Sequence, residues 1–197
     1  MGEKQNLLTS SSLLWQWDEA LSLCDFDIYA NEFRRLGAYE SLPGEPLLEF
    51  FDPIGLEQVE KFESEFGFQL PVAYRHFMTR FSNGFVSSDD WLGGFFKFDQ
   101  MVATANRRQR IELQSEFPID IISELKQEFS VDESHPGLLQ IGRAIGAFFL
   151  VINGPARGVV LGRSDDGIWG HIFLDFAEQP SNTFSALIKL FEHYCAE

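Results

Sequence analysis

The first strong pattern in the chain is a run of apolar residues separated by glutamates between Gly55 and Gly67. This spacing predicts an amphipathic helix over residues 55–66, with Gly67 ending it in a left-handed conformation. The expected core-facing side carries Val59, Phe62 and Phe66. The opposite side is expected to be mostly acidic and carries Glu57, Glu60, Glu63 and Glu65.

Pro71 opens a second predicted helix, because proline is tolerated in the first turn of a helix. The apolar residues of this helix fall at i, i+3, i+4 and i+7, the spacing of a stripe that faces a core: Tyr74, Phe77, Met78 and Phe81. The helix is expected to end at Asn83-Gly84, since glycine adopts a positive φ without strain.

Weaker patterns flank these two helices. Upstream, a spaced apolar face predicts a helical extension within residues 7–40, and a proline-rich connector follows over 41–53. Downstream, the pattern predicts a short strand at 95–98 and helices over 99–113 and 119–129.

The last third of the chain changes to strand-like runs separated by turn signals. These runs cover residues 138–141, 147–152, 158–163 and 168–174. Asn153-Gly154-Pro155 and Asp165-Asp166-Gly167 lie between them and favour tight turns, so an antiparallel meander is expected. A closing helix is predicted over 181–194. The pattern as a whole predicts an α+β protein, with a mixed or antiparallel sheet backed by helices, divided into an extension at 1–45 and a domain at 46–197.

Composition narrows the class of protein. The 197 residues include 15 basic and 30 acidic ones, for a formal net charge of −15, and 21 phenylalanines. The apolar content is sufficient for a core, which argues against disorder. The charge argues against nucleic-acid binding, because phosphate contacts need a basic face. It fits a protein that meets a basic partner.

Three further features bear on where the protein is found. The longest nearly apolar stretch, Ala144–Ile152, is too short for a helix that crosses a bilayer core of about 30 Å, so no membrane association is expected. Cys24 and Cys195 form no CxxC pair, which favours a reducing compartment. The chain begins without a cationic and apolar leader, so we expect a cytoplasmic protein.

No catalytic arrangement stands out in the sequence. The four histidines share no metal-ligand spacing with one another or with the cysteines, so no metal is expected. The glycine-rich segments lack the Lys-Ser/Thr ending of a phosphate-binding loop, so no cofactor is expected either. Asp89-Asp90 and Asp165-Asp166 lie beside Ser or Gly, where carboxylates usually form turns rather than act as an acid–base pair. We therefore expect a protein that is not an enzyme.

Several short motifs occur in an order that resembles the SUKH superfamily. They are the acidic helix, Gly67-Phe68-Gln69-Leu70-Pro71, the aromatic helix, Asn83-Gly84 and the strand Leu139-Gln140-Ile141-Gly142. The resemblance covers about residues 46–195. The residues that carry it have structural roles by this interpretation: Leu70, Pro71, Tyr74, Phe77, Phe81, Asn83, Gly84, Ile141 and Gly142.

The resemblance implies a sheet backed by helices that serves as a binding scaffold. The superfamily includes yeast cell-wall-assembly regulators and many bacterial immunity proteins of polymorphic toxin systems. The immunity proteins are antitoxins that occlude a cognate toxin, frequently a nuclease. The resemblance therefore implies toxin neutralisation through protein–protein interaction. The alternative is a regulatory interaction scaffold without a toxin partner, which would resemble the yeast branch.

Acidic residues concentrate in two stretches, 40–65 and 112–133, which are either solvated helix faces or a docking surface for a basic partner. Trp91, in a glycine-rich loop, is the candidate aromatic anchor of an interface, and a lid over the core is the other interpretation. The candidate partner-binding residues are Asp89, Asp90, Trp91, Glu57, Glu60, Glu63, Asp132, Glu133, Asp165 and Asp166.

Overall fold

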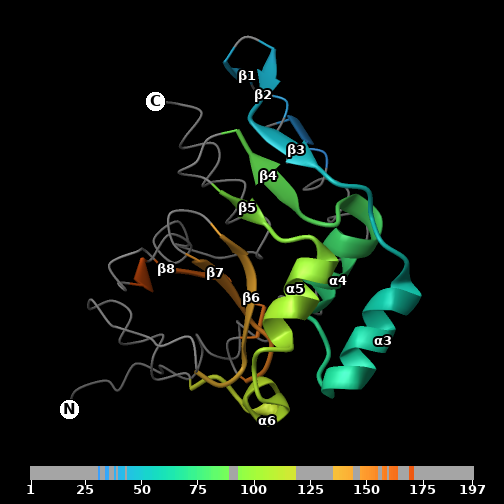
Figure 1. Ribbon diagram of the computed structural model, residues 1–197, viewed down its shortest axis with the longest axis vertical. Helices are drawn as coiled ribbons and strands as arrows, with labels where there is room; N and C mark the ends of the chain where they lie inside the picture. Colours follow the sequence, from blue (N-terminus) through green and yellow to red (C-terminus); the bar gives the residue numbers. More distant parts are fainter. Residues whose placement is uncertain are drawn as a thin grey trace, which may run out of the picture.

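A computed structural model describes residues 31, 34–35, 38, 40–42, 44–88, 93–118, 135–143, 147–154, 157–158, 160–163 and 169–170. Within these residues the fold is α+β, with helices gathered on one side of an antiparallel sheet (Figure 1). The predicted helices over 119–129 and 181–194 lie outside the described residues, as does most of the predicted extension over 7–40.

Seven strands form the sheet in the order in which they occur in the chain. They are β3 (Leu48–Phe50), β4 (Phe85–Ser87), β5 (Gly94–Phe95), β6 (Leu138–Arg143), β7 (Ala147–Val151), β8 (Val160–Arg163) and β9 (Trp169–Gly170). Every pairing in the sheet is antiparallel. The sheet is thus antiparallel rather than mixed, and β6 to β9 confirm the predicted meander.

The predicted connector over 41–53 contains strands that the sequence pattern misses. A small separate hairpin pairs β1 (Glu40–Leu42) with β2 (Glu45–Pro46), and β3 follows directly. β3 pairs with β4, more than thirty residues further along the chain. Strands of two or three residues are too short for an alternating pattern to be recognised. Their stability also comes from distant partner strands, which the local sequence does not reveal.

The two central helices follow the prediction closely. α3 (Leu56–Phe66) is the predicted acidic helix, and Gly67 ends it with a φ of 73°. α4 (Val72–His76) leads directly into a π-helical turn, η1 (Phe77–Phe81), in which the Ser82 N–H donates to the Phe77 carbonyl at 2.8 Å. The four residues of the predicted stripe are all buried: Tyr74, Phe77, Met78 and Phe81.

The single helix predicted over 99–113 is wrong. The structure has two shorter helices instead, α5 (Phe98–Ala105) and α6 (Arg110–Gln114). The residues between them are all polar, so no apolar side chain there holds a continuous helix against the core. The predicted strand at 95–98 is also shorter than expected, because α5 already begins at Phe98, whose N–H donates to the Asn83 side-chain oxygen at 2.7 Å.

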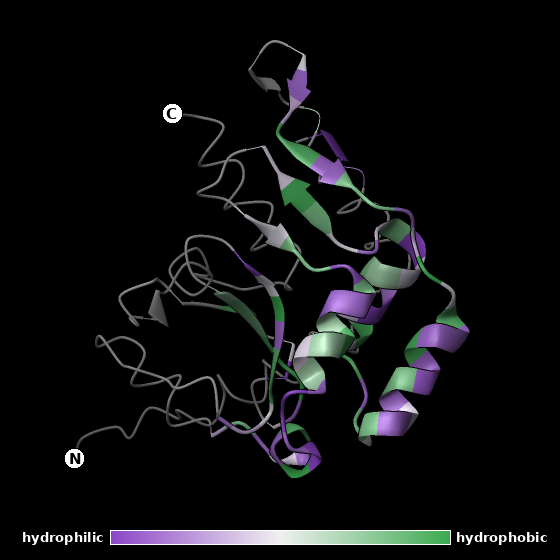
Figure 2. Ribbon diagram, viewed as in Figure 1, coloured by the Kyte–Doolittle hydropathy of each residue, from purple (hydrophilic) through white to green (hydrophobic). Residues whose placement is uncertain are grey.

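The main core lies between the helices and the sheet and consists largely of phenylalanine. Phe50, Phe85 and Phe95 occupy one row across β3, β4 and β5. The Phe85 and Phe95 rings lie 4.9 Å apart, and the Phe50 ring lies 4.9 Å from that of Phe81 on the helical side. Figure 2 shows the corresponding change along α3 between hydrophobic and hydrophilic positions. Much of the phenylalanine excess therefore serves the core.

The predicted extension at 1–45 has a described contact with the predicted domain at 46–197. The guanidinium of Arg34 lies over the Phe81 ring, 4.7 Å from its centroid. Such a cation–π contact at an exposed site contributes about 0.5–1 kcal/mol. The division of the chain into an extension and a domain stays a prediction.

Candidate functional site

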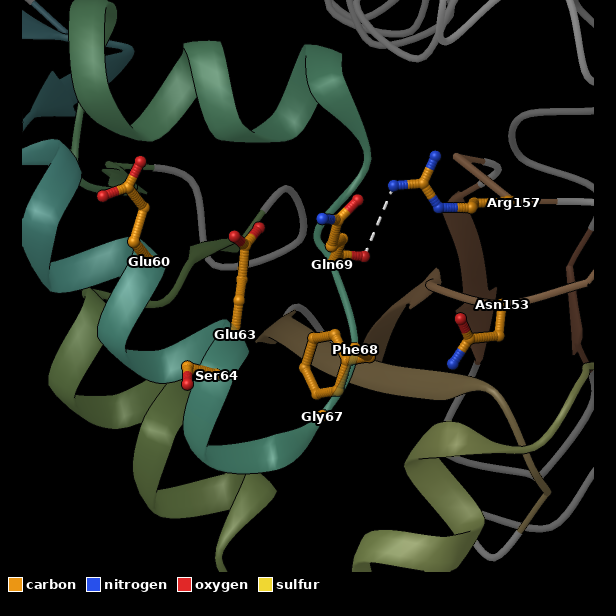
Figure 3. A pocket seen from close by; sticks show the side chains of 8 residues that line it. All are labelled: Glu60, Glu63, Ser64, Gly67, Phe68, Gln69, Asn153 and Arg157. Atoms are coloured by element: carbon orange, nitrogen blue, oxygen red, sulfur yellow. Dashed lines mark hydrogen bonds between the residues drawn. The ribbon is translucent and has the colours of Figure 1, made fainter.

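A cleft of about 570 Å³ opens between α3 and the turn that follows β7. Figure 3 shows the side chains that line it: Glu60, Glu63, Ser64, Gly67, Phe68, Gln69, Asn153 and Arg157. Most come from α3 and from residues 67–71, which join α3 to α4 and are called the connector from here on. The last two come from the turn beyond β7. The cleft therefore brings together segments that lie almost ninety residues apart in the chain.

Glu63 is the buried carboxylate of this cleft, with only 6% of its surface exposed. Its Oε1 accepts the Leu70 N–H at 2.8 Å and the Arg75 Nε–H at 3.2 Å. The Arg75 Nη2 group forms a further contact with the second carboxylate oxygen. The expectation that Glu63 shares the outer acidic face of α3 is therefore wrong, because its side chain is committed to contacts within the chain.

Arg157 holds the same connector from the other side of the cleft. Its Nη2 group donates to the carbonyls of Leu70 at 2.8 Å and Gln69 at 3.4 Å, and its Nε donates to that of Ile152 at 3.2 Å. Glu63 thus accepts an N–H of the connector while Arg157 donates to its carbonyls. We call this arrangement of Glu63, Arg75 and Arg157 around residues 67–71 the connector clamp.

The outer rim of the cleft is exposed and polar. Glu60, Ser64 and Gln69 are all exposed. Within the described part of the chain, the Glu60 carboxylate has no hydrogen bond or ion pair, in contrast to Glu63. In Figure 3, the Glu60 and Glu63 side chains extend from α3, and Gln69 and Arg157 lie across from them. Among the described residues, the rim therefore presents one carboxylate without a paired counter-charge, together with neutral hydrogen-bonding groups.

The structure places only part of the predicted partner-binding set. Glu57 and Glu60 are exposed on α3. The remaining candidates apart from Glu63 lie outside the described residues: Asp89, Asp90, Trp91, Asp132, Glu133, Asp165 and Asp166. Their roles stay predictions.

The motif residues that carry the family resemblance have structural surroundings. Leu70 and Pro71 are buried in the connector. Asn83 caps the start of α5. Ile141 is fully buried, and a Cβ at Gly142 would lie 2.4 Å from the Gly94 carbonyl oxygen. Only glycine therefore permits β5 and β6 to approach each other at this point.

Tyr74 is a buried core residue whose phenol has a shifted pKa. Burial raises the pKa of its phenol above the ordinary value of 10.0, and its hydroxyl contacts the Met101 sulfur at 3.9 Å. Because the folded state holds the proton more tightly than the unfolded state, this contribution to stability is complete below pH 10. It is lost as the pH rises further.

We therefore expect Tyr74→Phe to flatten the loss of stability at alkaline pH. Above pH 10 the unaltered chain is expected to lose up to about 1.4 kcal/mol more per pH unit than the variant. At pH 7 the substitution is expected to cost less than about 1 kcal/mol, because sulfur is a weak acceptor. Denaturant unfolding at several pH values measures both effects. Parallel pH profiles for the two chains would contradict the assignment.

Comparison with known proteins identifies the family. The sequence profile of the SMI1 / KNR4 family (SUKH-1) matches residues 53–188, which is more than half of the chain. The chain therefore belongs to the SMI1 / KNR4 family, and the resemblance to the SUKH superfamily is confirmed. No curated protein and no solved structure matches the chain.

In the part of the chain that the structure describes, no group of three or more His, Cys, Asp or Glu side chains is placed to hold a metal ion. None of the described helices combines the length and hydropathy that a membrane span requires.

Proposed function

We propose that this SUKH-family chain is an immunity protein, which binds a cognate toxin and occludes its active site or substrate channel. The charge of residues 44–66 carries the proposal. Lys61 is the one basic residue in this segment, against seven acidic ones: Glu45, Glu49, Asp52, Glu57, Glu60, Glu63 and Glu65. All of these acidic residues except Glu63 are exposed.

The elements that carry these exposed carboxylates, β2, β3 and α3, follow one another along one edge of the ribbon, which we call the acidic margin (Figure 1). Complementary charge accelerates association and selects partners. A nuclease toxin must present a basic surface to its nucleic-acid substrate. An acidic protein can cover that surface without binding nucleic acid itself. The proposal therefore describes a cytoplasmic binding protein that has no catalytic role and no membrane attachment.

Co-expression with the product of the adjacent gene tests the proposal. We expect that product to be toxic alone, to lose its toxicity when this chain is present, and to bind the purified chain with sub-micromolar affinity. A chain from an unrelated immunity pair, expressed at the same level, is the control. A neighbouring gene that encodes no toxin, or a toxin that does not bind, would contradict the proposal and favour the regulatory scaffold.

A further inference from the structure

We infer that a basic segment of the protein partner docks along one stripe of α3, with Leu56 as its apolar contact and Glu60 as its charged contact. This inference rests on the proposed function, and it specifies which part of the acidic margin makes contact. It is carried by the geometry of α3, by the exposure of Leu56 and by the distribution of counter-charges around the cleft.

The stripe follows from the helical repeat. Leu56, Glu60, Glu63 and Gly67 occur at i, i+4, i+7 and i+11, which places them on one side of the helix. Three of them, from Glu60 onward, line the cleft. Leu56 extends the same stripe beyond the cleft toward the start of the helix. A partner segment lying along α3 would therefore meet Leu56 first and then enter the cleft.

Leu56 supplies the apolar part of this surface. With 47% of its surface exposed, it is one of three large apolar side chains that are exposed in the described part of the chain. Asp52, Pro53 and Glu57 are exposed beside it in the sequence. An apolar contact within a charged rim is the usual organisation of a protein–protein interface.

The positions of the basic groups around the cleft distinguish Glu60 from Glu63. Arg75 pairs with Glu63, and the Arg157 guanidinium donates to main-chain carbonyls. Glu60 has no such partner among the described residues, and it lies next to Ser64 and Gln69 on the exposed rim. A lysine or arginine of the partner would supply the missing counter-charge, since complementary charges across an interface accelerate association and select the partner.

The opposite side of α3 provides matched controls. Glu65 lies on the side that faces α6, with its Oε1 3.9 Å from Arg110 Nη2, and its side chain is 51% exposed. Ile111 on α6 is 69% exposed. Glu65→Lys and Ile111→Ala therefore repeat the chemical changes of Glu60→Lys and Leu56→Ala away from the proposed stripe.

The experiment measures the dissociation constant of each purified variant with the purified toxin encoded beside this chain's gene. We expect Glu60→Lys to weaken binding by about thirtyfold and Leu56→Ala by about tenfold. The two control variants are expected to change the constant by less than about threefold. Thermal unfolding of all four variants establishes that each remains folded.

The possible results separate this inference from the proposed function. Binding by the unaltered chain with equal losses for Glu60→Lys and Glu65→Lys would overturn the inference and leave the proposed function intact. Losses confined to the control variants would overturn it in the same way. If the unaltered chain does not bind the toxin, the proposed function fails and the inference fails with it.

Discussion

Replacing Gly84 by alanine is expected to lower the free energy of unfolding by at least about 3 kcal/mol. Gly84 has a φ of 87°, which disfavours any residue with a Cβ atom. An added Cβ would also lie 2.5 Å from the Phe96 carbonyl oxygen and 2.6 Å from that of Phe95. Both oxygens belong to the main chain, so the clash cannot be relieved by a side-chain rotation.

Gly44→Ala separates the two contributions, and urea unfolding of both variants measures them. Gly44 has a similar φ of 84°, but a Cβ there would meet no atom within 4 Å. The control is therefore expected to lose only the backbone strain, about 1–2 kcal/mol. Equal losses for the two variants would show that the surroundings of Gly84 yield to the methyl group and that the contact argument is wrong.

Glu63→Ala is expected to lower the free energy of unfolding by about 3 kcal/mol, because it removes the acceptor at the centre of the connector clamp. The substitution leaves the Leu70 N–H and the Arg75 guanidinium without the carboxylate that pairs with them. The side chain of Arg75 is 29% exposed, so water recovers part of the loss. Without that exposure, breaking a buried pair would cost more.

Two other substitutions in the same helix act as controls for Glu63→Ala, with urea unfolding as the measurement. Glu60→Ala, on the exposed rim, is expected to change the free energy of unfolding by less than about 0.5 kcal/mol. Glu63→Gln keeps the size of the side chain and one acceptor oxygen, so a smaller loss than for alanine is expected. If Glu63→Ala and Glu60→Ala behave alike, the connector clamp does not stabilise the fold.

The central helices could be predicted from the sequence because their determinants are local. The stripe from Tyr74 to Phe81 is visible in the residue spacing alone, and it is buried as expected. Gly67 and Gly84 likewise have the positive φ values that their positions suggest. The order of these motifs, rather than any single motif, made the family recognisable.

The candidate site was only partly predictable, because its key contacts join distant residues. The spacing predicts Glu63 on the acidic side of α3, but the Leu70 N–H and Arg75 hold its carboxylate in a buried position. Arg157 was missed entirely, since nothing around it in the sequence points to carbonyls that lie 87 residues earlier.

The order of the strands has a consequence for how this chain folds. Every strand of the sheet pairs only with strands next to it in the chain order, so most pairings close short loops. Two pairings are exceptions: β3 with β4 spans more than thirty residues, and β5 with β6 joins Phe95 to Gly142 across the longest connection in the sheet. Closing a longer loop costs more entropy and slows folding. We therefore expect the pairings of β3 with β4 and of β5 with β6 to form after the short-range pairings among β6, β7, β8 and β9.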